Sequence, residues 1–134
     1  MKIRLREWKT IECNFKLSLD DIEDEKDLFN LESASQFPEG DEKEFAIRLR
    51  LTIENDSCNL LIETIYFFEV DQVISDEFKK SHFPKVNAPA IAFPYLRAFV
   101  SNITLQAGID PIMLPSINFV EREQSSVNDR NISK

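Results

Sequence analysis

Two neighbouring runs of alternating apolar and polar residues constrain the fold of this chain more than any other feature of its sequence. In residues 44–54, EFAIRLRLTIE, every second side chain is apolar, and the run CNLLIETIYFFEV at 58–70 follows after Asn55 and Asp56. A period of two residues is that of a β-strand with a buried face. A short polar turn between two such runs indicates a hairpin, so we expect these residues to pair as antiparallel strands.

The second run of this hairpin is apolar on both faces. Leu61, Ile65 and Phe67 fall on one face, while the opposite face carries a second apolar set: Leu60, Ile62, Tyr66 and Phe68. A strand of this kind needs a cover on each side of its sheet. If helices cover only one side, the second cover would be another subunit or a ligand.

Two further strands are expected before the hairpin. Residues 11–19, IECNFKLSL, alternate cleanly, and the opening residues alternate as well. Trp8 is out of phase with both, which predicts a β-bulge near residues 7–9. The acidic run 20–27 holds six carboxylates around one lysine and is expected to be a solvated loop, and residues 27–37 are the second candidate strand.

A long helix is expected after the hairpin. Residues 75–83 predict one or two helical turns capped by Ser75. Apolar residues then recur at helical spacing, namely Leu96, Phe99, Val100, Ile103 and Ala107. Gly108 suits the left-handed end of this helix, and Pro94 fits either its first turn or a kink. Residues 109–119 are too broken by proline for a helix and too apolar for a free loop, so we expect them to lie against the body.

Length and charge limit the classes of protein. The chain of 134 residues is expected to form one domain over 1–120, with 121–134 a polar tail that is frayed or disordered. Its net charge of -8 disfavours nucleic acid and anionic membranes as partners. The sequence has no run of about 18 apolar residues and no secretory signal at its opening, so we expect no membrane insertion and a cytoplasmic location.

The sequence offers little catalytic chemistry. His82 is the only histidine, and the two cysteines, Cys13 and Cys58, belong to no CxxC motif. Both cysteines fall in strands and are expected to be buried thiols, with a disulfide or ligand role as the alternative. The only glycines, Gly40 and Gly108, are too few for a phosphate-binding loop. We therefore expect no enzyme activity, no cofactor and no metal, although counting cannot exclude a carboxylate pair.

Eleven phenylalanines give a stronger signal. Five of them gather in or beside segments that already have more apolar surface than one small core requires: Phe67, Phe68, Phe93, Phe99 and Phe119. Core packing explains any single one as well as a surface role does. As a set they indicate an apolar surface used for oligomerisation, ligand binding or both.

Residues 87–119, NAPAIAFPYLRAFVSNITLQAGIDPIMLPSINF, resemble the SecB family of protein-export chaperones. The shared motifs are FPYxR at the start of a long helix and a proline-bearing loop that ends in P-x-N-F. The matching residues are Phe93, Pro94, Tyr95, Arg97, Pro111, Leu114, Pro115, Asn118 and Phe119. The resemblance implies an α+β fold with a four-stranded antiparallel sheet followed by a long helix, assembly as a dimer of dimers, and apolar grooves that hold non-native chains.

The resemblance also implies particular sites. The polypeptide-binding groove would lie between the last strand, the helix and the following loop, with Leu60, Ile62, Tyr66, Phe68, Ile109, Ile112 and Met113 as its wall. The helix residues expected in the oligomer are Leu96, Phe99, Val100 and Ile103. In the family, carboxylates on the outer sheet surface dock the basic tail of the motor SecA. Glu12 and Glu63 fall at two such positions, whereas Lys16 falls where a third acidic residue is expected.

Three functions of different classes follow from these observations. The first is a SecB-like chaperone that holds unfolded or precursor polypeptides for export, as a homo-oligomer (dimer or tetramer) with SecA as a candidate partner. The second is a chaperone or adaptor dedicated to one partner, as in toxin–antitoxin systems, which Lys16 and the polar tail favour. The third is a small enzyme, in which substitution of His82 would abolish activity.

Overall fold

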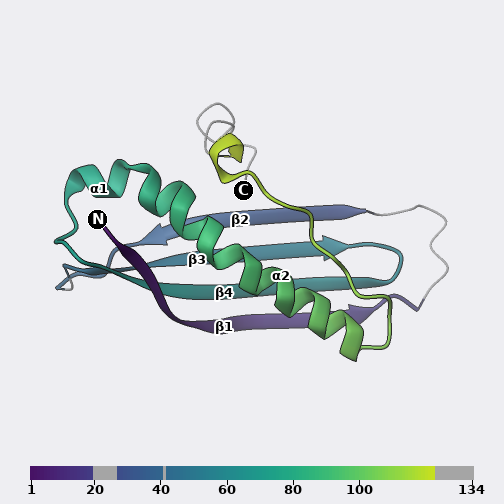
Figure 1. Cartoon of the computed structure of the whole chain (residues 1–134). Coiled ribbons are helices and arrows are strands. Elements are labelled where there is room, and N and C mark those ends of the chain that lie inside the picture. The colour runs from purple at the N-terminus through teal and green to yellow at the C-terminus, as the bar shows by residue number, and fades with distance from the viewer. Residues whose placement is uncertain (20–26, 41, 123–134) are drawn as a thin grey trace.

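The computed structural model describes residues 1–19, 27–40 and 42–122 and contains a single four-stranded antiparallel sheet. Its strands are β1 (Ile3–Leu17), β2 (Leu28–Gln36), β3 (Glu44–Glu54) and β4 (Cys58–Val70), arranged in the order β1-β4-β3-β2. One long helix crosses one face of this sheet (Figure 1). The predicted α+β fold is confirmed. Most of the predicted acidic loop, at 20–26, and of the polar tail, at 123–134, lies outside the described residues.

The central hairpin forms as the alternation predicts. Strands β3 and β4 pair from Glu44 opposite Glu69 to Glu54 opposite Asn59. The Asn55 carboxamide oxygen closes the turn, because it accepts hydrogen bonds from the backbone N–H groups of Ser57 at 2.8 Å and Cys58 at 2.9 Å. An asparagine that bonds the backbone two residues further on is typical of tight turns.

Strand β1 contains two irregularities, of which the first borders the predicted position and the second was not predicted. The register with β4 shifts between Leu5 and Glu7 and again between Thr10 and Glu12, whereas one bulge was expected near residues 7–9. Each shift adds one residue to β1, which turns the following side chains to the other face. Two shifts therefore bring Trp8 onto the helix-covered face and then restore the phase beyond Ile11.

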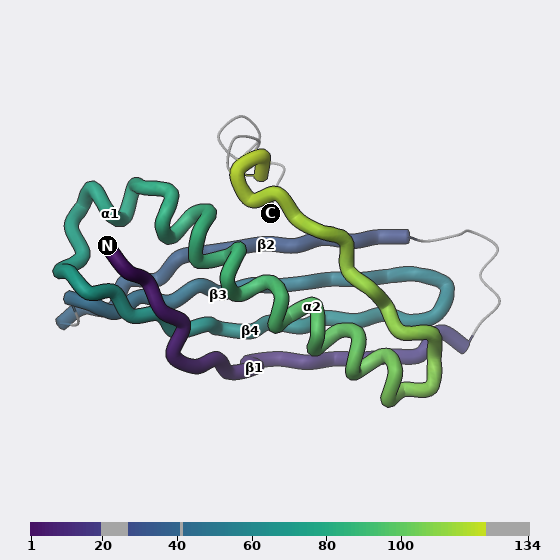
Figure 2. Tube along the Cα trace, viewed as in Figure 1, coloured from purple at the N-terminus to yellow at the C-terminus, as the bar shows by residue number. Residues whose placement is uncertain are grey.

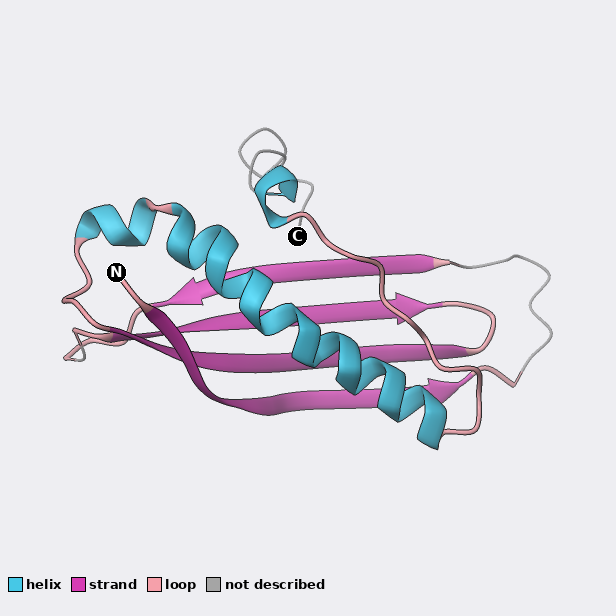
Figure 3. Cartoon of the chain, in the orientation of Figure 1, coloured by secondary structure: helices cyan, strands magenta, loops and turns pink. Residues whose placement is uncertain are grey.

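The helical segment begins earlier than the FPYxR motif, which was expected to start the long helix. Helix α1 (Asp76–Lys80) is capped by Ser75, as predicted, and leads through the π-helix η1 (Phe83–Asn87) into α2 (Ala88–Gln106), as Figure 3 shows. Pro94 thus lies inside α2 and not in its first turn. It deprives the Ala90 carbonyl of its N–H partner, but Ala90 is exposed, so water can bond that oxygen.

The chain after α2 returns across the sheet. Gly108 adopts a φ of 88° and ends the helix, as predicted, and the following segment runs over the sheet to β2 (Figure 2). The buried Thr104 hydroxyl holds this segment: it accepts a hydrogen bond from the N–H of Ile112 at 2.9 Å and donates one to the Val100 carbonyl at 2.8 Å. Leu114 and Phe119 are buried, which confirms that this segment lies against the body.

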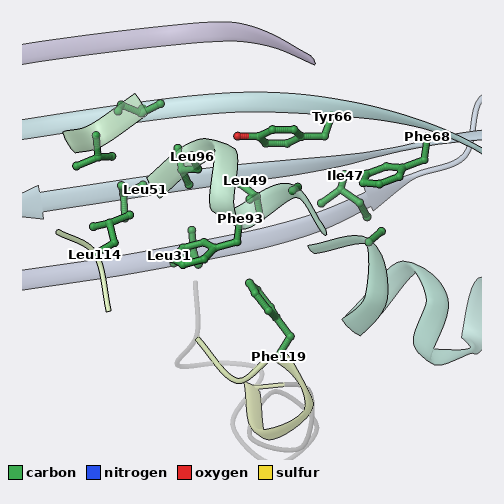
Figure 4. Packing of buried hydrophobic residues seen from close by; sticks show 14 of the residues in the cluster. Leu31, Ile47, Leu49, Leu51, Tyr66, Phe68, Phe93, Leu96, Leu114 and Phe119 are labelled. Carbon is green, nitrogen blue, oxygen red and sulfur yellow. The ribbon is translucent and has the colours of Figure 1, made fainter. Parts of the chain in front are cut away.

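The core lies between α2 and one face of the sheet (Figure 4). It is built from the odd-numbered apolar residues of β3, the even-numbered ones of β4, and the helix residues Ala92, Leu96 and Val100. On the other face of β4, Leu61, Ile65 and Phe67 are half-buried. The strand is therefore apolar on both faces, but α2 covers only one of them.

Candidate polypeptide-binding surfaces

The structure divides the predicted groove wall into a closed part and an accessible part. Four of its members, Leu60, Ile62, Tyr66 and Phe68, are at most 2% exposed, because α2 packs on that face of β4. These four side chains do not form an open wall in this structure. In the loop, Ile109 and Ile112 are half-buried and Met113 is 66% exposed.

The predicted oligomer helix divides in the same way. Leu96 and Val100 are fully buried against the sheet, so they hold α2 in place and are not available to another subunit. Phe99 and Ile103 are half-buried at the margin of the core. A helical stripe predicts which residues are apolar but not how much of the stripe the chain's own sheet already covers.

An exposed aromatic pair lies where α2 meets β1, and we call this place the β1–α2 seam. The rings of Trp8 and Tyr95 lie 4.5 Å apart, and each residue is 45% exposed. The buried ring of Tyr66 lies 6.3 Å from that of Trp8, and burial raises the pKa of Tyr66 to about 12. The sequence reasoning did not assign this pair a binding role. The signal that could have found it is the irregular phase of Trp8.

Cys13 lies on the same strand and corrects another expectation. It is exposed, whereas Cys58 is buried as predicted, and both thiols are free. Cys13 faces the helix side of the sheet opposite Ile62, but β1 is an edge strand that α2 covers only in part. The expectation of a buried thiol assumed a cover that the structure does not provide there.

The second candidate surface is the free edge of the sheet at β2, and we define the β2 edge as residues 31–36. Its pairing with β3 runs without a shift, and its sequence, LESASQ, contains no proline, lysine or arginine. Such residues and bulges are the usual means of protecting an edge strand. Ser33 and Ser35 lie on the helix-covered face, opposite Leu49 and Ile47, yet both are exposed. This part of β2 is therefore open at its edge and on its faces.

Apolar side chains flank the β2 edge on the helix side. The Ser35 hydroxyl donates a hydrogen bond to the Pro84 carbonyl at 3.4 Å, which places η1 beside the strand. The same short helix carries the half-buried Phe83 and Val86, and Phe37 follows directly after the strand. The ring of Phe37 stacks on the buried ring of Phe45 at 5.8 Å. The exposed residues of this strand thus lie next to a strip of partly exposed apolar side chains, Phe37, Phe83 and Val86.

The outer face of the sheet carries the predicted motor-docking residues. The structure brings Glu12 and Glu63 together, since they are directly opposite each other in the β1–β4 register. Glu63 is only 13% exposed and pairs with Arg48 at 3.4 Å and Arg50 at 3.3 Å, and Arg50 also lies 3.9 Å from Glu12. The chain's own arginines therefore neutralise both carboxylates. Further along this face, Arg4 and Arg6 pair with Glu69, and Arg6 also pairs with Glu44.

Two further results concern the residues that the structure describes. None of their histidine, cysteine, aspartate and glutamate side chains gather in groups of three or more that could hold a metal ion. In that same part of the chain, no helix is both long enough and apolar enough to cross a membrane.

The described residues define a small α+β domain, with a sheet that a helix covers on one face and a regular edge strand β2 that is exposed over residues 33–36. The chain belongs to the SecB family: residues 22–124 match the family model described as preprotein translocase subunit SecB. Its relatives include an uncharacterized protein of Methanocaldococcus jannaschii, 38% identical over 79 residues, which are 59% of this chain and 44% of that protein. The protein-export protein SecB of Roseobacter denitrificans is 30% identical over 96 residues, 68% of this chain and 57% of that protein. This chain thus spans about half the length of these relatives.

Solved structures support the same fold. The SecB-like chaperone of Mycobacterium tuberculosis, solved in complex with a peptide from the HigA1 antitoxin, superposes with a TM-score of 0.67 at 13% identity, covering 87% of this chain and 88% of that one. A protein of unknown function from Streptococcus agalactiae gives a TM-score of 0.60, also at 13% identity, covering 87% of this chain and 98% of that one. At this level of identity the likeness concerns the fold alone.

Proposed function

We propose that this chain is a SecB-like molecular chaperone of the cytoplasm that holds unfolded or precursor polypeptides in an extended form for protein export. The observation that carries this proposal is the open β2 edge beside a strip of apolar side chains, in a protein of the SecB family. Its role is binding and not catalysis, and it needs no cofactor.

The β2 edge suits a non-native polypeptide because main-chain hydrogen bonds do not depend on sequence. A client segment that adds to β2 as a further strand would satisfy the outward N–H and C=O groups of the edge. Alternate client side chains would then point toward Phe37, Phe83 and Val86. Contact with these residues would favour client side chains that are apolar. The exposed, flexible Met113 offers a further adaptable contact. Affinity would come from many such weak contacts along one bound chain.

Self-assembly is the second part of this proposal. The β1–α2 seam exposes Trp8 and Tyr95, with Phe99 and Ile103 half-buried on the same helix. Aromatic residues of this kind are enriched in the centres of protein interfaces. We propose that a second copy of the chain covers this seam, in a dimer or tetramer.

The charges of the outer face favour a second candidate, a chaperone dedicated to one partner. A basic tail of SecA that docked at Glu63 would have to displace Arg48 and Arg50 from it. The exposed Lys16 on this face would also repel such a tail. A pull-down from the native host separates the candidates, because an export chaperone would recover many precursors and SecA, and a dedicated one a single partner.

Aggregation of chemically reduced insulin provides the direct test of chaperone activity. Stoichiometric amounts of the purified protein should delay the rise in light scattering, and an equal mass of an unrelated acidic protein should not. Holding activity would be excluded if the scattering curves with and without this protein coincide.

A further inference from the structure

The C-terminal part of the described chain forms a turn that is anchored at both ends. The Asn118 side chain accepts hydrogen bonds from the N–H groups of Val120 at 3.1 Å and Glu121 at 3.2 Å. The N–H of Arg122 bonds the Asn118 carbonyl at 3.1 Å. Phe119 packs edge-on against Phe93, with ring centroids 5.8 Å apart, and is buried. Figure 4 shows Phe119 projecting from this turn toward the core residues beside Leu31.

From this turn, Arg122 reaches the β2 edge. Its guanidinium donates a hydrogen bond to the backbone carbonyl of Leu31, 91 residues earlier in the chain. Burial of Arg122 lowers its pKa, in keeping with a half-buried side chain at this contact. Because Arg122 belongs neither to β3 nor to any other strand, the Leu31 carbonyl is accessible from the free side of β2.

The direction of this carbonyl defines which groups of β2 point outward. In an antiparallel strand the N–H and C=O of one residue point to the same side, and the side alternates from residue to residue. The outward groups are therefore those of Leu31, Ser33 and Ser35. Arg122 binds the first of them, where the strand is buried, whereas the other two lie in the exposed half of the edge.

We propose that Arg122 is a built-in competitor for the β2 edge, which an extended client must displace in order to pair along the full strand. This inference rests on the proposed function. A client would first pair at Ser33 and Ser35 and then take the Leu31 carbonyl from Arg122. If the turn leaves with Arg122, Phe119 uncovers Phe93, so that displacement also adds apolar surface next to the bound chain.

The test is a titration of reduced, carboxymethylated α-lactalbumin, an unfolded probe that stays in solution, into the full chain and its variants. Arg122→Ala should lower the Kd by about tenfold, the factor equivalent to about 1.4 kcal/mol for a hydrogen bond from a charged donor. Arg122→Gln keeps a shorter donor without the charge and should fall between the two. Lys16→Ala removes a positive charge at the opposite edge of the sheet and should leave the Kd unchanged.

Amide exchange of residues 31–36 gives a second measurement. In Arg122→Ala the bound probe should protect the N–H groups of Leu31, Ser33 and Ser35 more strongly than in the unsubstituted protein. The proposal that Arg122 competes with the client would be refuted by any of three results for Arg122→Ala. These are tighter binding without the added protection, a Kd equal to that of the unsubstituted protein, or weaker binding. If the alanine variant fails to fold, the glutamine variant decides by the same criteria. Failure of every protein to bind the probe would instead refute the proposed function.

Discussion

A proline at Ser33 provides the sharpest test of the β2 edge. If the N–H of Ser33 points away from β3, proline removes a donor that no other strand uses, and its ring occupies the space of an added strand. A client would lose one or two main-chain hydrogen bonds at about 1 kcal/mol each, which corresponds to roughly 5- to 30-fold weaker binding. The fold should persist, because pairing with β3 is untouched.

Two control variants isolate the effect of the main chain. Ser33→Ala changes the same side chain without altering the edge and should bind as the unsubstituted protein does. Ala34→Pro removes an N–H that points toward β3 and should destabilise the protein, as seen by urea denaturation. The probe is carboxymethylated α-lactalbumin, with Kd measured by calorimetry. Unchanged affinity in a folded Ser33→Pro protein would refute strand addition at this edge.

Three further outcomes are expected. Thr104→Val should lower the free energy of unfolding in urea by about 1–3 kcal/mol, because it leaves the N–H of Ile112 without its partner; an unchanged midpoint would contradict this role. Trp8→Ala should reduce the mass of the assembly in light scattering, and an unaltered mass would place the interface elsewhere. Tyr66 has a pKa of about 12 in the fold and about 10 when unfolded, so stability should fall as the pH rises above 10; Tyr66→Phe should abolish that part of the pH dependence.

The strands and the helix could be predicted because apolar residues recur at a regular spacing within one contiguous run of residues in each of them. Strand β3 and the stripe from Leu96 to Val100 follow their patterns directly. The face of β4 that α2 covers could not be predicted, since both faces are apolar and only the packed structure distinguishes them. For this reason Tyr66 and Phe68, expected in a groove, lie in the core.

Contacts between residues distant in sequence were the other part that the sequence could not predict. Trp8 meets Tyr95, and Arg122 meets the Leu31 carbonyl, and neither pair shares a local pattern. The contact of Arg122 is the harder one to predict, because its partner is a backbone oxygen, which every residue has. By contrast, the prolines and apolar residues of 109–119 predicted a loop that lies against the body, because these residues restrict the chain locally.

The two edges of this sheet differ in a way that limits how copies of the protein can join. Strand β2 presents a regular row of outward groups, whereas β1 is displaced twice, at Arg6 and at Ile11. A regular edge cannot continue into an irregular one, so β2 of one copy has no matching surface at β1 of the next. A guest strand can therefore extend the sheet at β2, whereas head-to-tail addition of a further copy would meet the irregular edge of β1.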